Sequence, residues 1–301
     1  MSKLGKVAIF GVVFIVIGLV IIFTILGLNN WKLEEKFEMK EFVSSIDCTS
    51  LELEFDEGTV KTQFYDGDKI KVEYPTSKHR KVEFVEYTDS DKLFVETKNK
   101  FRWLGFRSLF SKIPEMTISI PKNSVIDINY HINAGKVEIA SGNYEHVIIS
   151  LNAGEIKLGD INCSKFNANI NTGTFTMNKL VTGKSNLIIN AGNFTVKQLD
   201  CTELDSNINA GNIKFENVVS NKLTTEVNAG NFTMNNVKCD NVRIQMNAGT
   251  VNMGILGGKA EYTIRVEKPT SSCNLTNQEG SDPNKIIDID NSVGSITINF
   301  K

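Results

Sequence analysis

A three-residue corner, Asn-Ala-Gly, recurs at a fixed interval through the middle of the chain and constrains the fold more than any other feature. The copies are evenly spaced with a period of 19 (152 − 133 = 19), without insertion or deletion, and one copy has Thr172 in place of the alanine. Its asparagines are Asn133, Asn152, Asn171, Asn190, Asn209, Asn228 and Asn247. Its glycines are Gly135, Gly154, Gly173, Gly192, Gly211, Gly230 and Gly249. A fixed short period indicates a repeat architecture, in which each unit buries its apolar face only against its neighbours.

The residues after each corner alternate between apolar and polar side chains. We number each unit from place 1 to place 19, so that His131 takes place 1 of the first unit. Places 7 and 9 are then apolar in every unit, as in Val137 and Ile139, and the place between them is polar, as in Glu138. This alternation has the period of a strand, and Val, Ile, Phe and Thr suit a half-buried pleated surface. A second strand leads into each corner.

The corner residues have a mechanical interpretation. Glycine adopts a positive φ without a Cβ clash, asparagine tolerates the left-handed region, and alanine is small enough to turn inward at a tight bend. When units are stacked, the asparagines can form an amide ladder in which each side chain bonds the next. A row of ligand-binding amides is the alternative, which we favour less because every unit has the residue whereas a binding site needs only one place.

The sequence therefore predicts an all-β fold, a parallel β-solenoid (β-helix) in which each 19-residue unit is one coil. Residues 131–263 would form seven coils (7 × 19 = 133). At about 4.8 Å per coil, these and partial end coils give a rod roughly 40 Å long. Spacing alone leaves the handedness and cross-section open.

Irregular segments flank the repeats. Residues 45–130 read as a β-rich cap over the first coil, which protects an open sheet edge. Its expected strands are residues 51–60, 69–74, 81–87, 92–97, 116–120 and 125–132, with a hairpin-type turn at 66–68. Residues 264–301 read as a loop and a final coil, in which residues 291–294 echo the corner with one residue more.

An uncharged apolar run occupies residues 7–28. As a helix this run would extend about 33 Å, enough to cross a hydrocarbon core of about 30 Å. We expect an uncleaved signal anchor, preceded by a short cytoplasmic tail (residues 1–6) and followed by a juxtamembrane stalk (residues 29–44). Lysines flank both sides and leave the orientation open, while the short tail favours a cytoplasmic amino terminus and an external domain.

A known family has the same order of features. A strand-rich lead-in contains Asp47-Cys48-Thr49 and Thr117-Ile118-Ser119-Ile120-Pro121, Asn-x-Gly corners follow, and residues 291–298 close the series. Over residues 45–301 the chain resembles the bacterial putative-adhesin family of β-solenoid domains, which also occurs in membrane-anchored cell-envelope stress proteins. The resemblance implies the architecture well and brings no established catalytic residues.

The cysteines do not suggest a disulfide framework. Cys163, Cys201 and Cys239 share place 14 and recur every second unit. Two coils span about 9.6 Å, beyond the ~7 Å limit on the Cα separation of a disulfide. We therefore expect three free thiols that face inward as small hydrophobic groups. Cys48 and Cys273 could meet only if both ends of the chain folded back.

The sequence contains no arrangement that predicts catalysis. His79, His131 and His146 lack metal-ligand spacing, so we expect no metal and no cofactor. There is no phosphate-binding loop and no Gly-x-Ser-x-Gly motif. The formal charge of −2 argues against a general nucleic-acid binder. We expect a protein that is not an enzyme.

One basic and aromatic segment, residues 98–112, is a candidate contact loop. It includes Arg102, Trp103, Phe106 and Arg107 and has no acidic residue. Such a loop could lie on anionic membrane or contact a partner. A capping role, in which its aromatic residues plug the open end of the solenoid, is the alternative we favour.

Three functional hypotheses remain. The first is a single-pass rod on the bacterial cell membrane, facing outward, with an adhesion, binding or envelope-stress role towards an envelope polymer or protein partner. The second is a cytoplasm-facing, bactofilin-like scaffold that polymerises end to end. The third and least favoured is a carbohydrate-active β-helix enzyme. The sequence does not determine the ligand or the oligomeric state.

Overall fold

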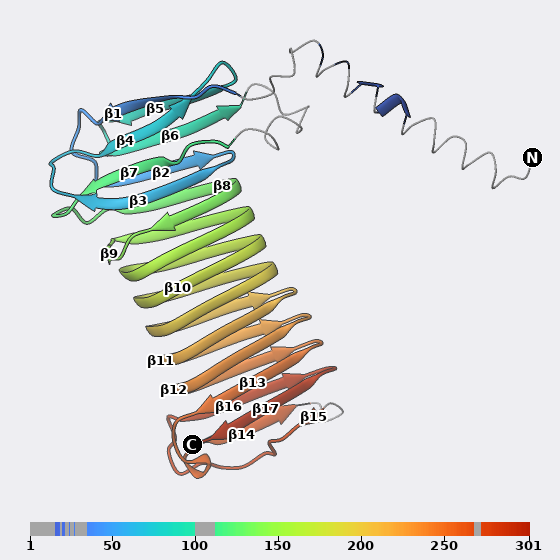
Figure 1. Cartoon of the computed structure of the whole chain (residues 1–301). Helices are drawn as coiled ribbons and strands as arrows, with labels where there is room; N and C mark the ends of the chain where they lie inside the picture. Colours follow the sequence, from blue (N-terminus) through green and yellow to red (C-terminus); the bar gives the residue numbers. More distant parts are fainter. Residues whose placement is uncertain are drawn as a thin grey trace, which may run out of the picture.

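The computed structural model describes residues 16–18, 20–21, 24, 27, 35–99, 112–267 and 272–301. Within these residues seventeen strands join in one sheet, and Figure 1 shows them stacked along an elongated body. Apart from helical residues before residue 28, the described helical structure is one short 3-10 helix, η1 (Lys259–Glu261). The all-β prediction is confirmed.

The strands fall into a cap, a repetitive centre and a distal end. The cap contains β1 (Glu38–Val43), β2 (Ser50–Phe55), β3 (Thr59–Tyr65), β4 (Lys71–Thr76), β5 (Arg80–Tyr87), β6 (Lys92–Asn99) and β7 (Met116–Pro121). The centre contains β8 (Asp127–Ile139), β9 (Gly142–Asn143), β10 (His146–Ile208), β11 (Asn212–Val227), β12 (Asn231–Met246) and β13 (Thr250–Ile255). The distal end contains β14 (Thr263–Glu267), β15 (Ser272–Cys273), β16 (Ile286–Asn291) and β17 (Ser295–Phe300).

Parallel pairing in the centre joins residues that are one repeat period apart. Asn193 of β10 pairs with Asn212 of β11 (212 − 193 = 19), and Val227 of β11 pairs with Met246 of β12 (246 − 227 = 19). In-register parallel strands place equivalent side chains of successive units directly beside one another. Outward side chains therefore form rows along the rod, and inward ones form columns in its interior.

The interior columns are apolar and tightly filled. Phe175, Phe194 and Phe232 each expose 1% or less of their surface, and the alternate residues face outward. The rings of Phe175 and Phe194 stack with centroids 4.3 Å apart. Ile213 continues this column as the strand partner of Phe194. Burying each phenylalanine contributes about 1.5–3 kcal/mol of hydrophobic free energy, so the column is a main source of stability.

The single strand predicted at residues 51–60 is wrong, because the structure has two strands there, β2 and β3. Both pair in parallel with β8, through Phe55 with Ile132 and through Thr59 with Lys136. Gly58, at φ 118°, makes the bend between them. β2 and β3 thus form one more layer of the central stack, although β4 to β7 lie between them and the first repeat in the chain.

The hairpin predicted at residues 66–68 is also wrong. β3 and β4 flank β7 instead of pairing with each other, β3 in parallel and β4 antiparallel. The turn residues correctly indicated a change of direction there, but each of the two strands pairs with β7 and not with the other. β5 and β6 do form an antiparallel hairpin, and β1 pairs with β4. Phe42 and Phe84, with ring centroids 4.1 Å apart, join β1 to β5.

At the distal end, β16 and β17 extend the central sheet. Met246 pairs with Asn291 and Thr250 pairs with Ser295, so the offset is identical on both sides of the corner (291 − 246 = 295 − 250). The corner therefore has the ordinary length, and the expected extra residue is wrong. Ser292 takes the asparagine place, and Asn291 lies one place earlier, in the interior with 0% exposure.

One side-chain amide and one stretch of backbone cover the last strands. Asn274 donates to the carbonyl of Ile298 at 2.9 Å and accepts from its N–H at 2.9 Å, so its amide imitates one step of a strand. Gln278 forms an isolated bridge with Ile264 of β14, with backbone bonds of 2.9 and 3.0 Å. Backbone groups that would otherwise be free for another strand are therefore occupied at these positions.

Parts of the predicted amino-terminal region and contact loop lie outside the described residues. Of residues 7–28, only 16–18, 20–21, 24 and 27 are described. Over the described chain, the structure has no helix that combines the length and apolarity needed to cross a membrane. The tail (residues 1–6) and the loop with Arg102, Trp103, Phe106 and Arg107 are not described. The predicted stalk contains β1, which belongs to the sheet.

Candidate functional site

The seven corner asparagines form a continuous ladder of side-chain hydrogen bonds. Each Nδ2 donates to the Oδ1 of the asparagine one unit nearer the cap, from Asn247 through to Asn133. The six distances between successive amides, starting from Asn152 and Asn133, are 2.9, 2.7, 2.6, 2.6, 2.8 and 2.6 Å. Most of these amides are exposed along one edge of the rod. Each uses one donor and one acceptor in the ladder and keeps one of each for solvent or a ligand.

A carboxylate ends this ladder at the cap. Asn133 donates to Oδ1 of Asp56 at 3.0 Å, and the backbone N–H of Asn99 donates to its other oxygen at 3.3 Å. An ionised carboxylate only accepts hydrogen bonds, so Asn133 must present its NH₂ group to Asp56. That orientation fixes the next amide, and each amide in turn fixes its neighbour. Sequence reasoning missed Asp56, whose signal is the tripeptide Asp56-Glu57-Gly58, a chemical analogue of the corner.

The corner glycines form a second column. All seven have φ between 112° and 151°, a range that side chains rarely adopt. A Cβ on Gly173 would lie 2.2 Å from the carbonyl oxygen of Gly154, and the other corner glycines meet similar obstacles. Gly58 and Gly294 extend the column to both ends of the stack, with φ of 118° and 151°. The column explains the glycines through backbone packing alone.

A shallow groove lies beside the first corners. Its walls include Glu57, Lys112, Lys136 and Glu155 around the backbone of Gly135. Lys136 is already paired with Glu138 at 2.6 Å, and the groove is wide open to solvent. Charges of both signs in such an open place do not define a ligand.

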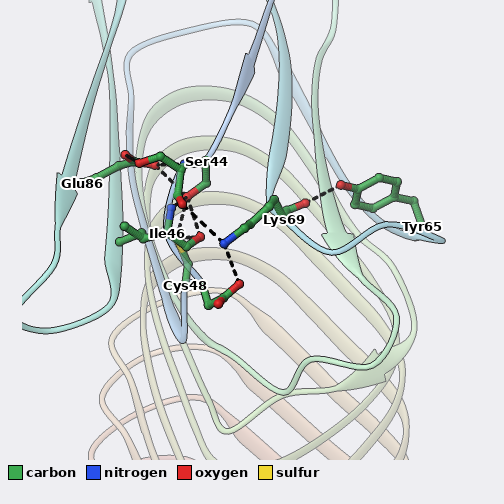
Figure 2. Close-up of polar contacts among 8 residues, drawn as sticks. Ser44, Ile46, Cys48, Tyr65, Lys69 and Glu86 are labelled. Atoms are coloured by element: carbon green, nitrogen blue, oxygen red, sulfur yellow. Dashed lines mark hydrogen bonds and ion pairs between the residues drawn. The ribbon is translucent and has the colours of Figure 1, made fainter.

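A polar cluster lies between the end of β1 and the end of β5 (Figure 2). One oxygen of Glu86 accepts from the Ser44 hydroxyl at 2.7 Å and from the Ser45 N–H at 2.6 Å. The Ser45 hydroxyl donates to the other oxygen. Burial pushes the pKa of Glu86 upward, but the hydrogen bonds from Ser45 and Ser44 outweigh it and leave the pKa below its ordinary value. The cluster joins the segment that follows β1 to the end of β5.

Cys48 and Lys69 complete this cluster without making it reactive. The Cys48 sulfur lies 3.1 Å from the Ser44 hydroxyl. Burial raises the thiol pKa, which disfavours the nucleophilic thiolate. Lys69 binds Asp47 at 2.7 Å, and its backbone carbonyl accepts from the Tyr65 hydroxyl (Figure 2). The contacts of Cys48 and Asp47 hold the segment between β1 and β2 in place.

The place-14 cysteines lie inside the rod. Cys163, Cys201 and Cys239 are free and expose 7%, 5% and 2% of their surface. Cys163 donates to Thr182 at 3.7 Å and Cys201 to Ser220 at 3.6 Å, so hydroxyls of the intervening units separate the thiols. Cys48 lies in the cap and Cys273 at the distal end, and both are free.

Arg80 is the least expected feature of the cap. It exposes 2% of its surface, and its guanidinium lies over the Phe55 ring, 5.5 Å from the centroid. None of its guanidinium nitrogens has a hydrogen bond in the described part of the chain. Burial lowers its pKa, an effect that the carboxylates of Glu57, Asp56 and Glu35 oppose. These acids would also repel an anionic ligand, so Arg80 is not a candidate anion site. We interpret Arg80 as a counter-charge to the three acids.

Among the described residues, no group of three or more His, Cys, Asp or Glu side chains is placed to hold a metal ion. His146 Nδ1 and Asp127 form a pair at 2.8 Å, in which both side chains are partly exposed. Asp127 also accepts from the His146 N–H at 3.0 Å, which secures the join between β8 and β10.

Comparison with known families agrees with the stack and its corners. The family model described as Toastrack DUF4097 matches residues 48–214 and 197–301, most of the chain. The chain belongs to the Toastrack DUF4097 family. The Toastrack match begins at Cys48, close to the expected start of the cap, and reaches Lys301. It supports the resemblance to bacterial putative adhesins inferred from the residues.

Three solved structures are similar to this Toastrack chain at low identity. A putative adhesin from Bacteroides fragilis is 11% identical, with 89% of this chain and 99% of that chain covered and a TM-score of 0.41. One from Parabacteroides distasonis is 12% identical, with 72% and 97% covered and a TM-score of 0.39. A putative cell adhesion protein from Clostridium sporogenes is 15% identical, with 88% and 100% covered and a TM-score of 0.29. No curated protein matches the chain significantly. Similarity at these TM-scores is too low to indicate a function.

Proposed function

We propose that this chain is a non-enzymatic binding rod of the adhesin type. In this proposal each 19-residue unit is one coil of a parallel β-solenoid. The observation that carries it is the parallel pairing from β8 to β13, which keeps one register except for a shift between Met234 and Val237 and places outward side chains in long rows. Rows of equivalent groups suit weak contacts with a repetitive partner, because many small contacts sum to a useful affinity.

The apolar run at residues 7–28 supports a single-pass anchor in the bacterial cell membrane. β1 begins at Glu38, shortly after the end of this run at Leu28, so the cap would be held close to the membrane and the distal end would project away. The short tail before the run favours an external rod. A role in envelope stress would use the same placement.

A cytoplasm-facing scaffold that polymerises end to end is the second candidate. It requires open strand edges at both ends of the stack. The side-chain amide of Asn274 and the backbone of Gln278 occupy backbone groups of β17 and β14 at the distal end, which disfavours this route. A carbohydrate-active enzyme is a third and weaker candidate. The polar clusters around Glu86 and His146 join neighbouring strands and do not form a pair of catalytic carboxyl groups.

The test uses bacteria that produce the full chain with an epitope after Lys301. Protease applied to intact cells should remove the epitope, and adhesion to envelope material from the same species should be lost when the chain is deleted. A matched strain that produces only the segment 1–34 controls for effects of the anchor. Resistance of the epitope in intact cells, but not in permeabilised ones, would refute the external rod. Filaments of the purified chain in electron micrographs would favour the scaffold.

A further inference from the structure

One long face of the rod is almost free of charge. It consists of places 6 and 8 in the distal half of the stack. We call it the neutral face and define it by Asn193, Thr195, Asn212, Lys214, Asn231, Thr233, Thr250, Asn252, Ser295 and Thr297. Strand pairing places these residues in two parallel columns. The residue between the two columns is buried in each strand, as Phe194, Phe232 and Val251 illustrate.

The single cation on this face, Lys214, forms an ion pair with a residue outside the two columns. Lys214 Nζ lies 2.9 Å from Glu216, two places further along its own strand, so its charge is partly compensated outside the two columns. The other nine members are Asn, Thr or Ser. Each offers hydrogen-bond donors and acceptors without a net charge.

The neutral composition does not extend to the first two units. The same two places near the cap hold alternating charges, with ion pairs of Lys136 with Glu138 at 2.6 Å and Lys157 with Glu155 at 2.7 Å. The face across the Asn-Ala-Gly corner also holds charges, among them Glu203, which pairs with Lys184 and Lys222. Solubility alone does not explain why one patch lacks charge, since the rest of the same rod has ion pairs.

The side chains of the neutral face are held in position before any ligand arrives. Asn231 donates to Asn212 at 2.9 Å, and Asn212 donates to Asn193 at 3.1 Å, so three amides share one orientation. Threonine has a branched Cβ and few accessible rotamers. Little side-chain entropy is therefore lost on binding.

We propose that the neutral face binds an uncharged, hydroxyl-rich polysaccharide that lies along the rod. Neighbouring strands are about 4.8 Å apart and alternate residues about 6.6 Å apart, which gives a flat grid of donors and acceptors roughly 19 Å long over five strands. A polymer of neutral sugars can match such a grid by direct and water-mediated hydrogen bonds. An anionic polymer would need several unpaired cations, whereas Lys214, the one cation among these ten positions, is paired with Glu216. An apolar segment would need exposed apolar side chains, which the ten positions lack. This inference rests on the proposed binding function and names its partner class.

The test measures co-sedimentation of the full chain, in detergent micelles, with suspensions of cellulose and of chitin. We expect binding to at least one of them that changes little between low and high salt, since no ion pair is involved. Thr250→Glu and Thr250→Lys should each raise the half-saturating concentration about tenfold or more, because either charge would lose water without gaining a partner. Thr224→Glu, across the corner, is the matched control and should bind as the unchanged chain does.

Other results would overturn the inference. Absence of binding to both polymers would do so, as would equal losses in the Thr250 and Thr224 variants. A gain with Thr250→Lys and a loss with Thr250→Glu would indicate an anionic ligand instead. Circular dichroism and thermal unfolding of each variant must match the unchanged chain, and Thr250→Ser, which keeps the hydroxyl, should retain binding. If cells still adhere through the chain while both Thr250 variants behave normally, the adhesin proposal stands and the neutral face is not its site.

Discussion

Asn133 and Asp56, 77 residues apart in sequence, are joined by a 3.0 Å hydrogen bond that ends the amide ladder at the cap. The bond connects the first repeat to a strand pair formed much earlier in the chain. Because the carboxylate can only accept, it orients an entire row of otherwise ambiguous amides. Ladder and cap are therefore one hydrogen-bonded system.

Removal of this carboxylate should weaken the whole stack. We expect Asp56→Ala to lower the free energy of unfolding by about 1.5–3 kcal/mol, the usual value of a hydrogen bond to a charged group. Asp56→Asn keeps an acceptor oxygen and should cost less. Denaturant unfolding of the purified chain measures both. Asp200→Ala, at an exposed position in the same rod, is the control and should change stability little.

A methyl group in the glycine column should be poorly tolerated. Gly173→Ala would place its Cβ 2.2 Å from the Gly154 carbonyl oxygen, at a φ of 146°. We expect a loss of about 3 kcal/mol or more, from backbone strain and overpacking combined. Gly254→Ala is the control, because its nearest neighbour is the flexible side chain of Lys301 at 3.3 Å. Equal losses in the two variants would contradict the backbone explanation.

The interior thiols should be protected from reagents until the rod opens. Burial raises the pKa of Cys201 to about 11 and that of Cys239 to about 12, from an ordinary value of 9.0. Alkylation at neutral pH, followed by mass spectrometry, should label the partly exposed Cys273 before either of them. Rapid labelling of Cys239 in the native chain would show that the core opens readily.

The same thiols predict a loss of stability in alkali. A folded-state pKa above the unfolded value stabilises the fold fully below pH 9, and this contribution disappears as the pH rises from 9 towards 12. Cys201→Ala should flatten the decline in the midpoint of thermal unfolding across that range. If the variant and the unchanged chain decline in parallel, the thiols are not the cause.

Acid should weaken the polar cluster around Glu86 in the cap. The pKa of Glu86 is depressed by hydrogen bonds from Ser45 and Ser44, despite an opposing effect of burial, so its contribution is present above its ordinary pKa of 4.5 and is lost as the pH falls below that value. Glu86→Gln should lower stability at neutral pH and remove part of the acid dependence. Glu54→Gln, at an exposed position on β2, should leave both unchanged.

The distal amides should keep single rods apart. Asn274→Ala frees the N–H and carbonyl of Ile298, which then become available to another chain. We expect more end-to-end association of the variant, measured by light scattering and electron microscopy. Asn299→Ala, at an exposed position next to Ile298 on β17, is the control. Unchanged association of the Asn274 variant would show that other groups protect this end.

The sequence was most informative where the chain repeats itself. Strand alternation was enough to place Phe194 and Cys201 in the interior and the Asn-Ala-Gly corners at the bends, because neighbouring units impose the same environment on each. Once the period ended, local signals were insufficient. The turn at residues 66–68 was visible, but the insertion of β7 between β3 and β4 depends on contacts distant in sequence.

Two features of the cap illustrate why the rest could not be predicted. Asp56 and Gly58 were hidden because Asp56-Glu57-Gly58 resembles the corner in chemistry but not in letters, and it lies outside the period. Arg80 looked like an ordinary charged residue at the start of a strand, and its burial over Phe55 follows only from the contact between the start of β5 and the end of β2. The neutral face, by contrast, could have been read from places 6 and 8 alone.

The glycine column has a consequence for how such a protein can vary. Every corner from Gly135 to Gly249 meets its predecessor in nearly the same way, so neither the cap nor the distal amides depend on how many corners lie between them. Gain or loss of whole turns would leave both terminal structures intact and change only their separation. A gene encoding this chain could thus adjust how far the distal end stands from the cap by simple duplication, without redesigning either extremity.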